Sequence, residues 1–341
     1  PLPKAGESSE RTRYLPRLWA QGYVGKAIDE PDLEETQRAE IVSLATEHFL
    51  LTPYTSLLVL EDDAMFRRFG IKQRTVERFA PYELPDSIPV VHEPLDALDA
   101  VVCASATPQQ PIPCTAALVL DALDRPEADI SAFDVNATCL SFVVALDLVS
   151  LALMAGRWKR VAIVSSEIAS VGLNPAHKES AALFGDGAAA VVVEAAEGPE
   201  TGILAADQRM FPDGAGFCRI RGGGTGLHPN HPDATPEEFL FEMHGPGLFM
   251  MALELLPPFT DGLLVRAGVA LEDIDLVIPH QASLPGLERM RGVMGIDPAR
   301  FLVTASEVGN VIAASIPLGL HRALATGRAN PGDTVLLLGT S

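Results

Sequence analysis

From about Leu98 onward, the chain alternates short apolar runs with longer segments in which apolar residues recur every three or four positions. Short apolar runs between polar or small residues predict buried strands, and the longer periodic segments predict helices. We expect strands at 100–103, 160–164, 188–193, 275–278 and 334–338, and helices at 114–123, 139–155, 246–267, 284–294 and 312–326. This alternation predicts a layered α/β fold.

Two parts of this pattern occur twice. Residues 95–102 resemble residues 271–278, and residues 152–164 resemble residues 323–338, in the same order and at nearly the same separation. The repeat indicates one duplicated half-unit, and the two halves meet near residues 195–205. A crevice between duplicated halves is a natural place for a functional site.

The repeat divides the chain into three parts. Residues 95–197 form the first half, residues 198–341 form the second half, and residues 1–94 form an N-terminal part. A length of 341 residues is enough for two domains of ordinary size or for one large duplicated domain.

Composition narrows the class of protein. The chain is 48% hydrophobic with a mean hydropathy of +0.20, which is typical of a soluble globular protein. Its apolar stretches fall short of the roughly 18–20 residues of a membrane span, and its first residues lack the apolar core of a signal peptide. The four cysteines match neither a metal-binding spacing nor a dense disulfide framework. We therefore expect a cytoplasmic protein without a bound metal ion or a membrane anchor.

The charge balance excludes one class of partner. The chain has 45 acidic and 25 basic residues, which give a formal charge of −20. Nonspecific nucleic-acid binding needs a basic surface, so we expect no nucleic-acid partner. The same balance excludes a generally cationic surface that could dock an acidic carrier protein. It does not exclude a local basic patch with that role.

The segment with the clearest chemistry is 133–142, FDVNATCLSF. An apolar run ends in small residues, Cys139 follows, and a helical pattern then continues to about Met154. A cysteine at a helix N-terminus is favoured as the thiolate by the free N–H groups and the helix dipole. The alternative for Cys139 alone is a buried structural cysteine.

Two polar residues of the second half complete a reactive set. His280 comes just after the predicted strand at 275–278, and Asn310 follows a glycine directly before a helix of small residues. With Cys139 they offer a nucleophile, a base or proton donor, and a neutral hydrogen-bonding side chain. Each residue alone also has a structural interpretation. His280 could be a histidine whose hydrogen bonds are satisfied within the fold, and Asn310 could be the N-cap of the helix that follows it.

The combination resembles a known family. The segments that carry the resemblance are 104–113 (ASATPQQPIP), 134–142 (DVNATCLSF), 183–188 (LFGDGA), 279–282 (PHQA) and 309–317 (GNVIAASIP). Together they are similar to ketoacyl-acyl-carrier-protein synthase III of the thiolase superfamily, over about residues 95–341. This resemblance implies a five-layer α-β-α-β-α fold with two duplicated halves, and a homodimer.

The resemblance also implies the chemistry. Cys139 takes an acyl group from a coenzyme A or carrier-protein thioester, and no cofactor takes part. His280 and Asn310 then bind the carbonyl of a malonyl- or acyl-thioester, whose enolate attacks the acyl group in a Claisen condensation. Fatty-acid, polyketide or related specialised biosynthesis is the implied setting.

Three further positions follow from the resemblance. It places Ile112 across the dimer interface in the partner's acyl pocket, Phe184 in the lining of that pocket, and Lys178 near the coenzyme A nucleotide. The alternatives are core packing for Ile112 and Phe184, and a solvated surface charge for Lys178.

The sequence also departs from the family. The turn after His280 reads His280-Gln281-Ala282-Ser283, and Pro285 stands where the family has a basic residue that helps to dock the carrier protein. Residues 15–70 resemble instead the tail of von Willebrand factor A proteins of the inter-α-trypsin type, and only residues 69–74 match the family's N-terminal element. Two alternatives therefore stay open beside condensation. One is acyl transfer to a hydroxyl or amine on the same scaffold, and the other is a non-catalytic partner subunit.

Overall fold

The computed structural model describes residues 20, 23–24, 35–47, 98–123, 129–196, 198 and 201–341. The chain forms two compact units, residues 1–90 and 91–341. In the first unit, the helix α2 (Glu35–Glu47) buries Ile41 and Ala45. The predicted resemblances at 15–70 and 69–74 otherwise lie outside the described residues and stay predictions, as does the division at residue 94.

The first half of the second unit contains a four-stranded sheet. Its strands are β1 (Ala100–Ala104), β2 (Ser131–Val135), β3 (Arg160–Glu167) and β4 (Gly187–Glu194), in the order β2-β1-β3-β4. β1 pairs in parallel with β2 and β3, whereas β4 pairs antiparallel with β3. Three of these strands were predicted. β2 was not, because only part of its surface is buried and its apolar pattern is interrupted.

The second half repeats part of this sheet. Here β7 (Leu276–Pro279) and β8 (Val335–Leu338) pair in parallel, as β1 and β3 do. The predicted helices are also present as α4 (Thr115–Ala122), α5 (Ser141–Met154), α7 (Gly245–Ala267), α8 (Leu284–Val293) and α10 (Ser315–Ala325).

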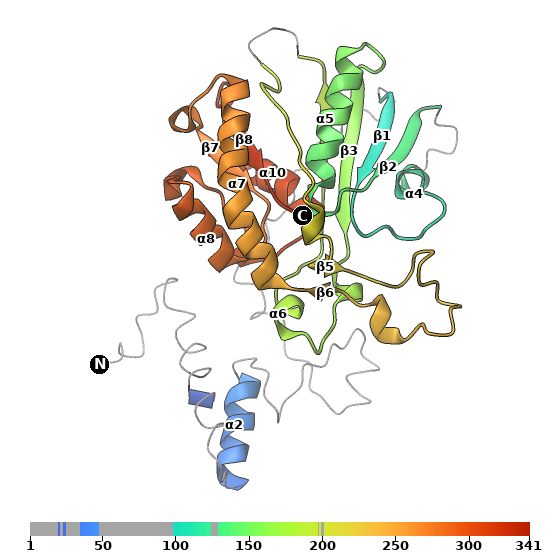
Figure 1. Cartoon of the computed structure of the whole chain (residues 1–341), viewed down its shortest axis with the longest axis vertical. Helices are drawn as coiled ribbons and strands as arrows, with labels where there is room; N and C mark the ends of the chain where they lie inside the picture. Colours follow the sequence, from blue (N-terminus) through green and yellow to red (C-terminus); the bar gives the residue numbers. More distant parts are fainter. Residues whose placement is uncertain are drawn as a thin grey trace. The chain divides into compact units, whose positions relative to one another are not determined.

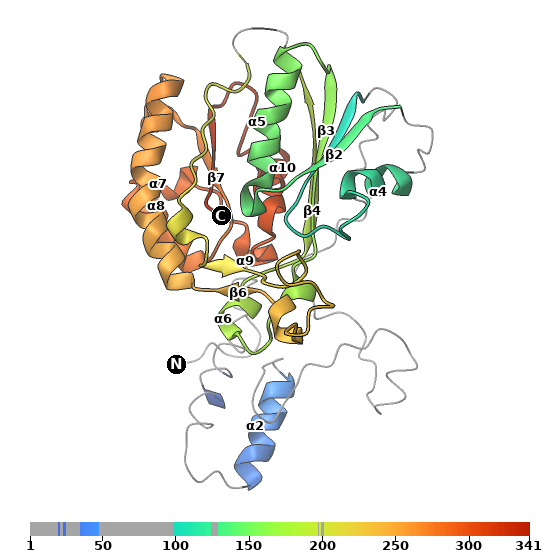
Figure 2. The same cartoon turned by 45° about the vertical axis from the view of Figure 1, so that its right-hand side comes forward.

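The elements of this unit stack in five layers. In Figures 1 and 2 the layers run from α7 and α8, through β7 and β8, to α5 and α10, then to the four-stranded sheet and finally to α4. One core cluster joins both sheets through the central helices, and it includes Phe142, Ile163, Ile278 and Ile316. The predicted α-β-α-β-α fold is therefore confirmed.

Equivalent residues cap equivalent strands in the two halves. Asp99, just before β1, accepts hydrogen bonds from the backbone N–H groups of Lys159 and Arg160 at 2.6 and 3.0 Å. Asp275, just before β7, accepts one from the N–H of Thr334 at 2.8 Å. The same local solution at both places confirms the duplication that the sequence repeat predicted.

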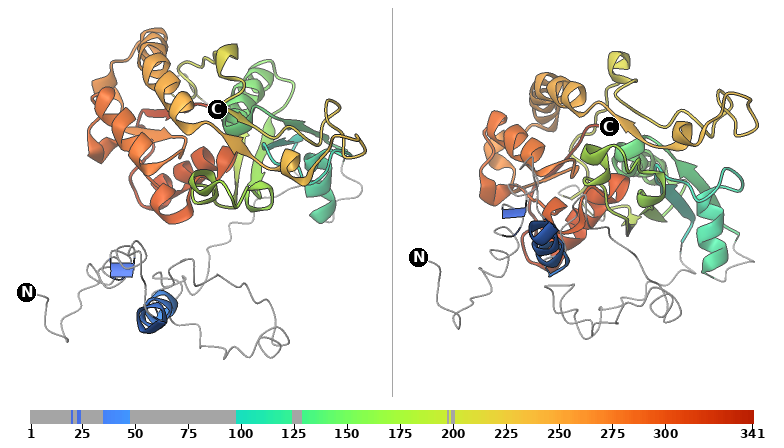
Figure 3. Two further views of the ribbon diagram at one scale, coloured as in Figure 1. Left: turned by 60° about the horizontal axis from the view of Figure 1, so that its bottom comes forward. Right: turned by 90° about the horizontal axis from the view of Figure 1, so that it is seen from below.

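The helix α7 is longer and more apolar as a whole than the separate apolar runs of the sequence indicate. Its 23 residues have the length and the apolar composition of a membrane-crossing helix, which the run lengths of the sequence did not reveal. Polar residues and Pro257 and Pro258 interrupt its apolar runs, so no single run is long. Its buried residues Leu256 and Leu263 pack in a cluster with β7 and β8, and Figure 3 shows α7 beside α8 on the outside of the second half.

Candidate active site

Cys139 lies in a 3-10 turn, η3 (Thr138–Leu140), directly before α5. Its side chain is half-buried. Burial is the largest influence and raises the pKa of the Cys139 thiol to about 12, and the nearby Cys218 and Glu167 act in the same direction. The expectation of a thiolate at rest is therefore wrong. Removal of the charged form from water outweighs the opposing effect of the local N–H group.

Asn310 has a fixed side-chain orientation. It is 4% exposed, and its Oδ1 accepts a hydrogen bond from the backbone N–H of Ile312 at 2.9 Å. Because the oxygen is occupied by a donor, the Nδ2 group is left as the outward donor of this side chain. A donor that is neutral and held in place suits a site where negative charge develops on a carbonyl oxygen.

His280 is buried at the end of β7. It is 6% exposed, and its backbone N–H donates to the carbonyl oxygen of Leu338 at 2.7 Å. Burial lowers the pKa of His280 to about 4, and the backbone of Ile312 partly opposes this effect. The imidazole is therefore neutral at physiological pH. Among the described residues, its Nδ1 atom is buried without a hydrogen-bond partner.

The segments that carry these three residues come together where the two halves meet. η3 packs against a second 3-10 turn, η9 (Ile312–Ala314), which follows Asn310. Gly339 lies between His280 and η3, the turn that contains Cys139. A Cβ atom at Gly339 would stand 2.9 Å from both the Cβ of His280 and the Cδ2 of Leu140. The structure thus gathers the neighbourhoods of Cys139, His280 and Asn310 around η3 and η9.

Close backbone contacts hold Asn310 in place. The N–H of Asn310 donates to the carbonyl oxygen of Leu183, and its own carbonyl accepts from the N–H of Gly185. Gly309 has a φ of 70°, and a Cβ there would stand 3.0 Å from the oxygen of Leu183. The LFGDGA and GNVIAAS motifs are therefore two sides of one backbone contact.

The remaining predicted residues lie in different surroundings. The backbone of Phe184 forms an isolated parallel β-bridge with that of Asn310, so Phe184 borders the site. Its ring packs edge-on against Phe241, with the ring centroids 5.1 Å apart. Ile112 is 85% exposed on the loop after β1. Lys178 is exposed at the start of the short helix α6 (Lys178–Ala181). Within the described residues, no contact joins Ile112 or Lys178 to Cys139.

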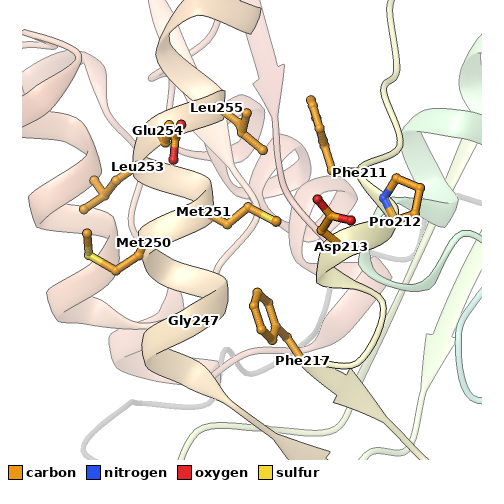
Figure 4. A pocket seen from close by; sticks show the side chains of 10 residues that line it. All are labelled: Phe211, Pro212, Asp213, Phe217, Gly247, Met250, Met251, Leu253, Glu254 and Leu255. Atoms are coloured by element: carbon orange, nitrogen blue, oxygen red, sulfur yellow. The ribbon is translucent and has the colours of Figure 1, made fainter.

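A separate open pocket of about 670 Å³ lies between α7 and the residues that precede the ribbon of β5 (Cys218–Arg219) and β6 (Glu242–Met243). Figure 4 shows Phe217 and Met251 facing this space beside Asp213. None of the predicted site residues lines this pocket.

Sequence reasoning missed two contributors to the site. The first is Ile312, whose backbone meets both Asn310 and His280. The second is Glu167, a fully buried acid at the end of β3. A carboxylate three residues after the predicted strand at 160–164 was the available signal for Glu167, whereas the role of Ile312 depends on backbone shape.

Family models match both halves of the chain. Residues 133–217 match the model described as 3-oxoacyl-[acyl-carrier-protein] synthase III, and residues 264–341 match the model of its C-terminal part. The first match contains Cys139, and the second contains His280 and Asn310.

Curated relatives agree with these matches. The chain is 37% identical over 247 residues to beta-ketoacyl-[acyl-carrier-protein] synthase III 3 of Streptomyces coelicolor, a match that covers 71% of this chain and 72% of the relative. It is 34% identical over 293 residues to beta-ketoacyl-[acyl-carrier-protein] synthase III of Nitratidesulfovibrio vulgaris, covering 83% of this chain and 88% of the relative. The second match is longer than residues 95–341, so the similarity extends into the N-terminal part.

Solved structures show the same fold. The synthase III of Aquifex aeolicus is 31% identical with a TM-score of 0.60, covering 72% of this chain and 73% of the other. The synthase III of Thermus thermophilus is 32% identical with a TM-score of 0.64, covering 72% and 74%. The chain therefore belongs to the 3-oxoacyl-[acyl-carrier-protein] synthase III family of acyltransferases.

Proposed function

We propose that this chain catalyses a Claisen condensation between an acyl thioester and a malonyl- or acyl-thioester. The observation that carries the proposal is the fixed amide of Asn310. The hydrogen bond from Ile312 to Oδ1 orients the amide of Asn310 and leaves Nδ2 as its donor, and the buried imidazole of His280 lies by the same turn. Two donors aimed at an oxyanion can stabilise it by ~3–4 kcal/mol each.

The first half-reaction loads Cys139. The sulfur attacks the carbonyl carbon of the acyl thioester, and the carrier leaves as its thiol. Because Cys139 rests as a thiol, its proton must move during the attack, and the neutral His280 is the nearby group able to accept it.

The second half-reaction forms the carbon–carbon bond. A malonyl thioester loses carbon dioxide and becomes an enolate, whose oxygen is stabilised by His280 and Asn310. The enolate carbon attacks the acyl group on Cys139, and the sulfur leaves as a thiolate that takes up a proton from the solvent. A non-decarboxylating acyl thioester would form its enolate by losing the α-proton to a base, for which the neutral imidazole of His280 is the candidate. Hydrogen bonds alone stabilise this enolate, so we propose that the reaction uses no metal ion or organic cofactor.

We propose coenzyme A thioesters as substrates in preference to carrier-protein thioesters. Ser283 caps α8 through a hydrogen bond from the N–H of Gly286, and Pro285 occupies the first turn, where the family has a basic residue. The formal charge of −20 adds a general repulsion toward an acidic carrier protein. A cytoplasmic location fits the four cysteines, all of which are free.

We also propose a homodimer. Ile112 presents an apolar side chain that is 85% exposed. Within the described residues β2 is an edge strand, and open edges favour pairing with another chain. A two-fold axis there would bring the loop of Ile112 to the partner subunit.

The function is tested by measuring two products side by side. Intact mass after incubation with a panel of acyl-coenzyme A thioesters should show one added acyl group in the wild type and none in Cys139→Ala, with Cys218→Ala as the control that still loads. Addition of a malonyl thioester should then release carbon dioxide and a ketoacyl product. Loading without a new carbon–carbon bond would point to acyl transfer to a hydroxyl or amine, and no loading would point to a non-catalytic subunit.

A further inference from the structure

Glu167 is a buried carboxylate for which the proposed reaction has no use. It ends β3 and is 1% exposed. Within the described part of the chain, no cation pairs with it. Burial raises the pKa of the Glu167 carboxyl, and hydrogen bonds from Thr107 and Ala106 oppose that rise, so specific donors are what can keep the buried group charged.

Those donors come from two different segments. Oε1 accepts from the N–H of Ala106 at 2.8 Å, and Oε2 accepts from the N–H and the hydroxyl of Thr107 at 3.0 and 2.6 Å. β3, which ends at Glu167, packs against η9, and the backbone of Ala313 in η9 acts to lower the pKa of Glu167. Ala106 and Thr107 begin the loop that carries Ile112, and Ala313 lies in η9. The carboxylate therefore joins that loop of the first half to the turn of the second half beside Asn310.

Glu167 ends β3 and Cys139 lies in η3, and both elements pack against η9, so the two residues stand on elements that border the same turn. The negative charge of Glu167 adds to the cost of forming a thiolate at Cys139. The other titratable groups around the thiol are Cys218 on β5 and, beyond Leu140 and Gly339, His280 after β7. Around Glu167 itself, the titratable neighbours are Cys103 on β1 and Cys139.

We propose that Glu167 is a positioning residue that fixes η9 against the Ala106–Thr107 loop and holds the resting Cys139 as a protonated, weakly reactive thiol. This inference rests on the proposed role of Cys139. The thiol would then lose its proton only when a substrate and His280 are in place, so that stray electrophiles react slowly with the free enzyme.

The charge is tested by Glu167→Gln, which keeps the size of the side chain and removes its charge. Iodoacetamide alkylation of Cys139, followed by peptide mass mapping to separate it from Cys103, should be on the order of tenfold faster than in the wild type at pH 8.5, because the thiol pKa falls. Thr107→Val is the control. It removes the two hydrogen bonds of the Thr107 hydroxyl, one to Glu167 and one from the N–H of Ile168, and keeps the charge, so its alkylation rate should stay within about twofold of the wild type.

The positioning is tested by Glu167→Asp, which keeps the charge on a side chain that is one methylene shorter. It should leave the pH profile of alkylation unchanged and lower condensation at least tenfold, because the carboxylate no longer reaches both segments. If Glu167→Gln does not fold, Glu167→Asp still tests the positioning role. Equal alkylation of wild type and a folded Glu167→Gln would overturn the electrostatic role, and wild-type condensation in Glu167→Asp would overturn the positioning role. Alkylation needs no acyl substrate, so failure of the proposed condensation would be seen separately.

Discussion

Thr138 and Ile312 adopt the same left-handed backbone conformation, each with a φ of 48°. Each donates its N–H to the side-chain oxygen of an asparagine two residues earlier, Asn136 at 3.0 Å and Asn310 at 2.9 Å. Each then starts a 3-10 turn that leads into a central helix. The turns that carry Cys139 and Asn310 are therefore two copies of one duplicated turn, and Ala313 stands in the second copy where Cys139 stands in the first.

The first prediction concerns the reactivity of Cys139 in the free enzyme. Since burial raises the pKa of the thiol to about 12, alkylation by iodoacetamide should rise about tenfold per pH unit from pH 7 to 10. The measurement is the rate of mass gain at Cys139 across this range. A plateau near pH 8 would show instead a thiolate stabilised by the helix terminus.

The second prediction concerns the buried imidazole. The pKa of His280 is lowered from 6.5 to about 4, so between these values the unfolded chain binds a proton that the folded chain does not. The contribution of His280 to the free energy of unfolding is fully present above pH 6.5. It falls as the pH drops toward 4, by on the order of 2–3 kcal/mol.

His280→Asn should remove this dependence. Denaturant unfolding of wild type and variant at pH 7 and pH 5 is the measurement, and the loss of stability at pH 5 should be smaller in the variant. An identical loss in both proteins would mean that His280 titrates normally.

The third prediction concerns the backbone contact that holds Asn310. Gly309→Ala puts a Cβ 3.0 Å from the carbonyl oxygen of Leu183 at a φ of 70°. We expect a loss of stability of about 2–4 kcal/mol. Gly268→Ala is the comparison, because Gly268 has the same φ at the end of α7 with nothing within 4 Å but a ψ of 26°, in the ordinary left-handed region, against −162° at Gly309, and it should cost about 1 kcal/mol. Equal losses would show that neither the contact with Leu183 nor the unusual ψ of Gly309 adds to the cost.

The fourth prediction concerns the dimer. Sedimentation at micromolar concentration should show two copies, and Ile112→Asp should weaken the association at least tenfold because it places a charge in an apolar interface. Met154→Asp changes a similarly exposed apolar residue, 83% against 85%, and should leave the association unchanged. A wild-type monomer would contradict the proposed dimer.

Local pattern predicted most of the fold but little of the electrostatics. Apolar periodicity located helices such as α5 and α10 because one face of each is buried, and the repeat of 95–102 at 271–278 predicted the duplication. The state of Cys139 was predicted wrongly because helix-terminus reasoning counts only neighbours in sequence. Its pKa depends on burial and on Glu167 and Cys218, which only the folded chain brings close.

Condensation is the central claim, and Asn310→Asp tests it most directly. Asp keeps an oxygen for the N–H of Ile312 but replaces the Nδ2 donor with negative charge where the enolate oxygen develops. The carbon dioxide-releasing step should slow by a hundredfold or more, equivalent to about 3 kcal/mol or more. Loading of Cys139 should change much less, because it does not pass through that enolate.

The control is Asn136→Asp in the equivalent turn, which should fold and still release carbon dioxide. The decisive measurement is acyl-enzyme formation and carbon dioxide release from a malonyl thioester, side by side in wild type and Asn310→Asp. We predict near-normal loading with strongly reduced carbon dioxide release in the variant. Equal losses in both steps, or a wild type that loads and never releases carbon dioxide or forms a carbon–carbon bond, would contradict the account.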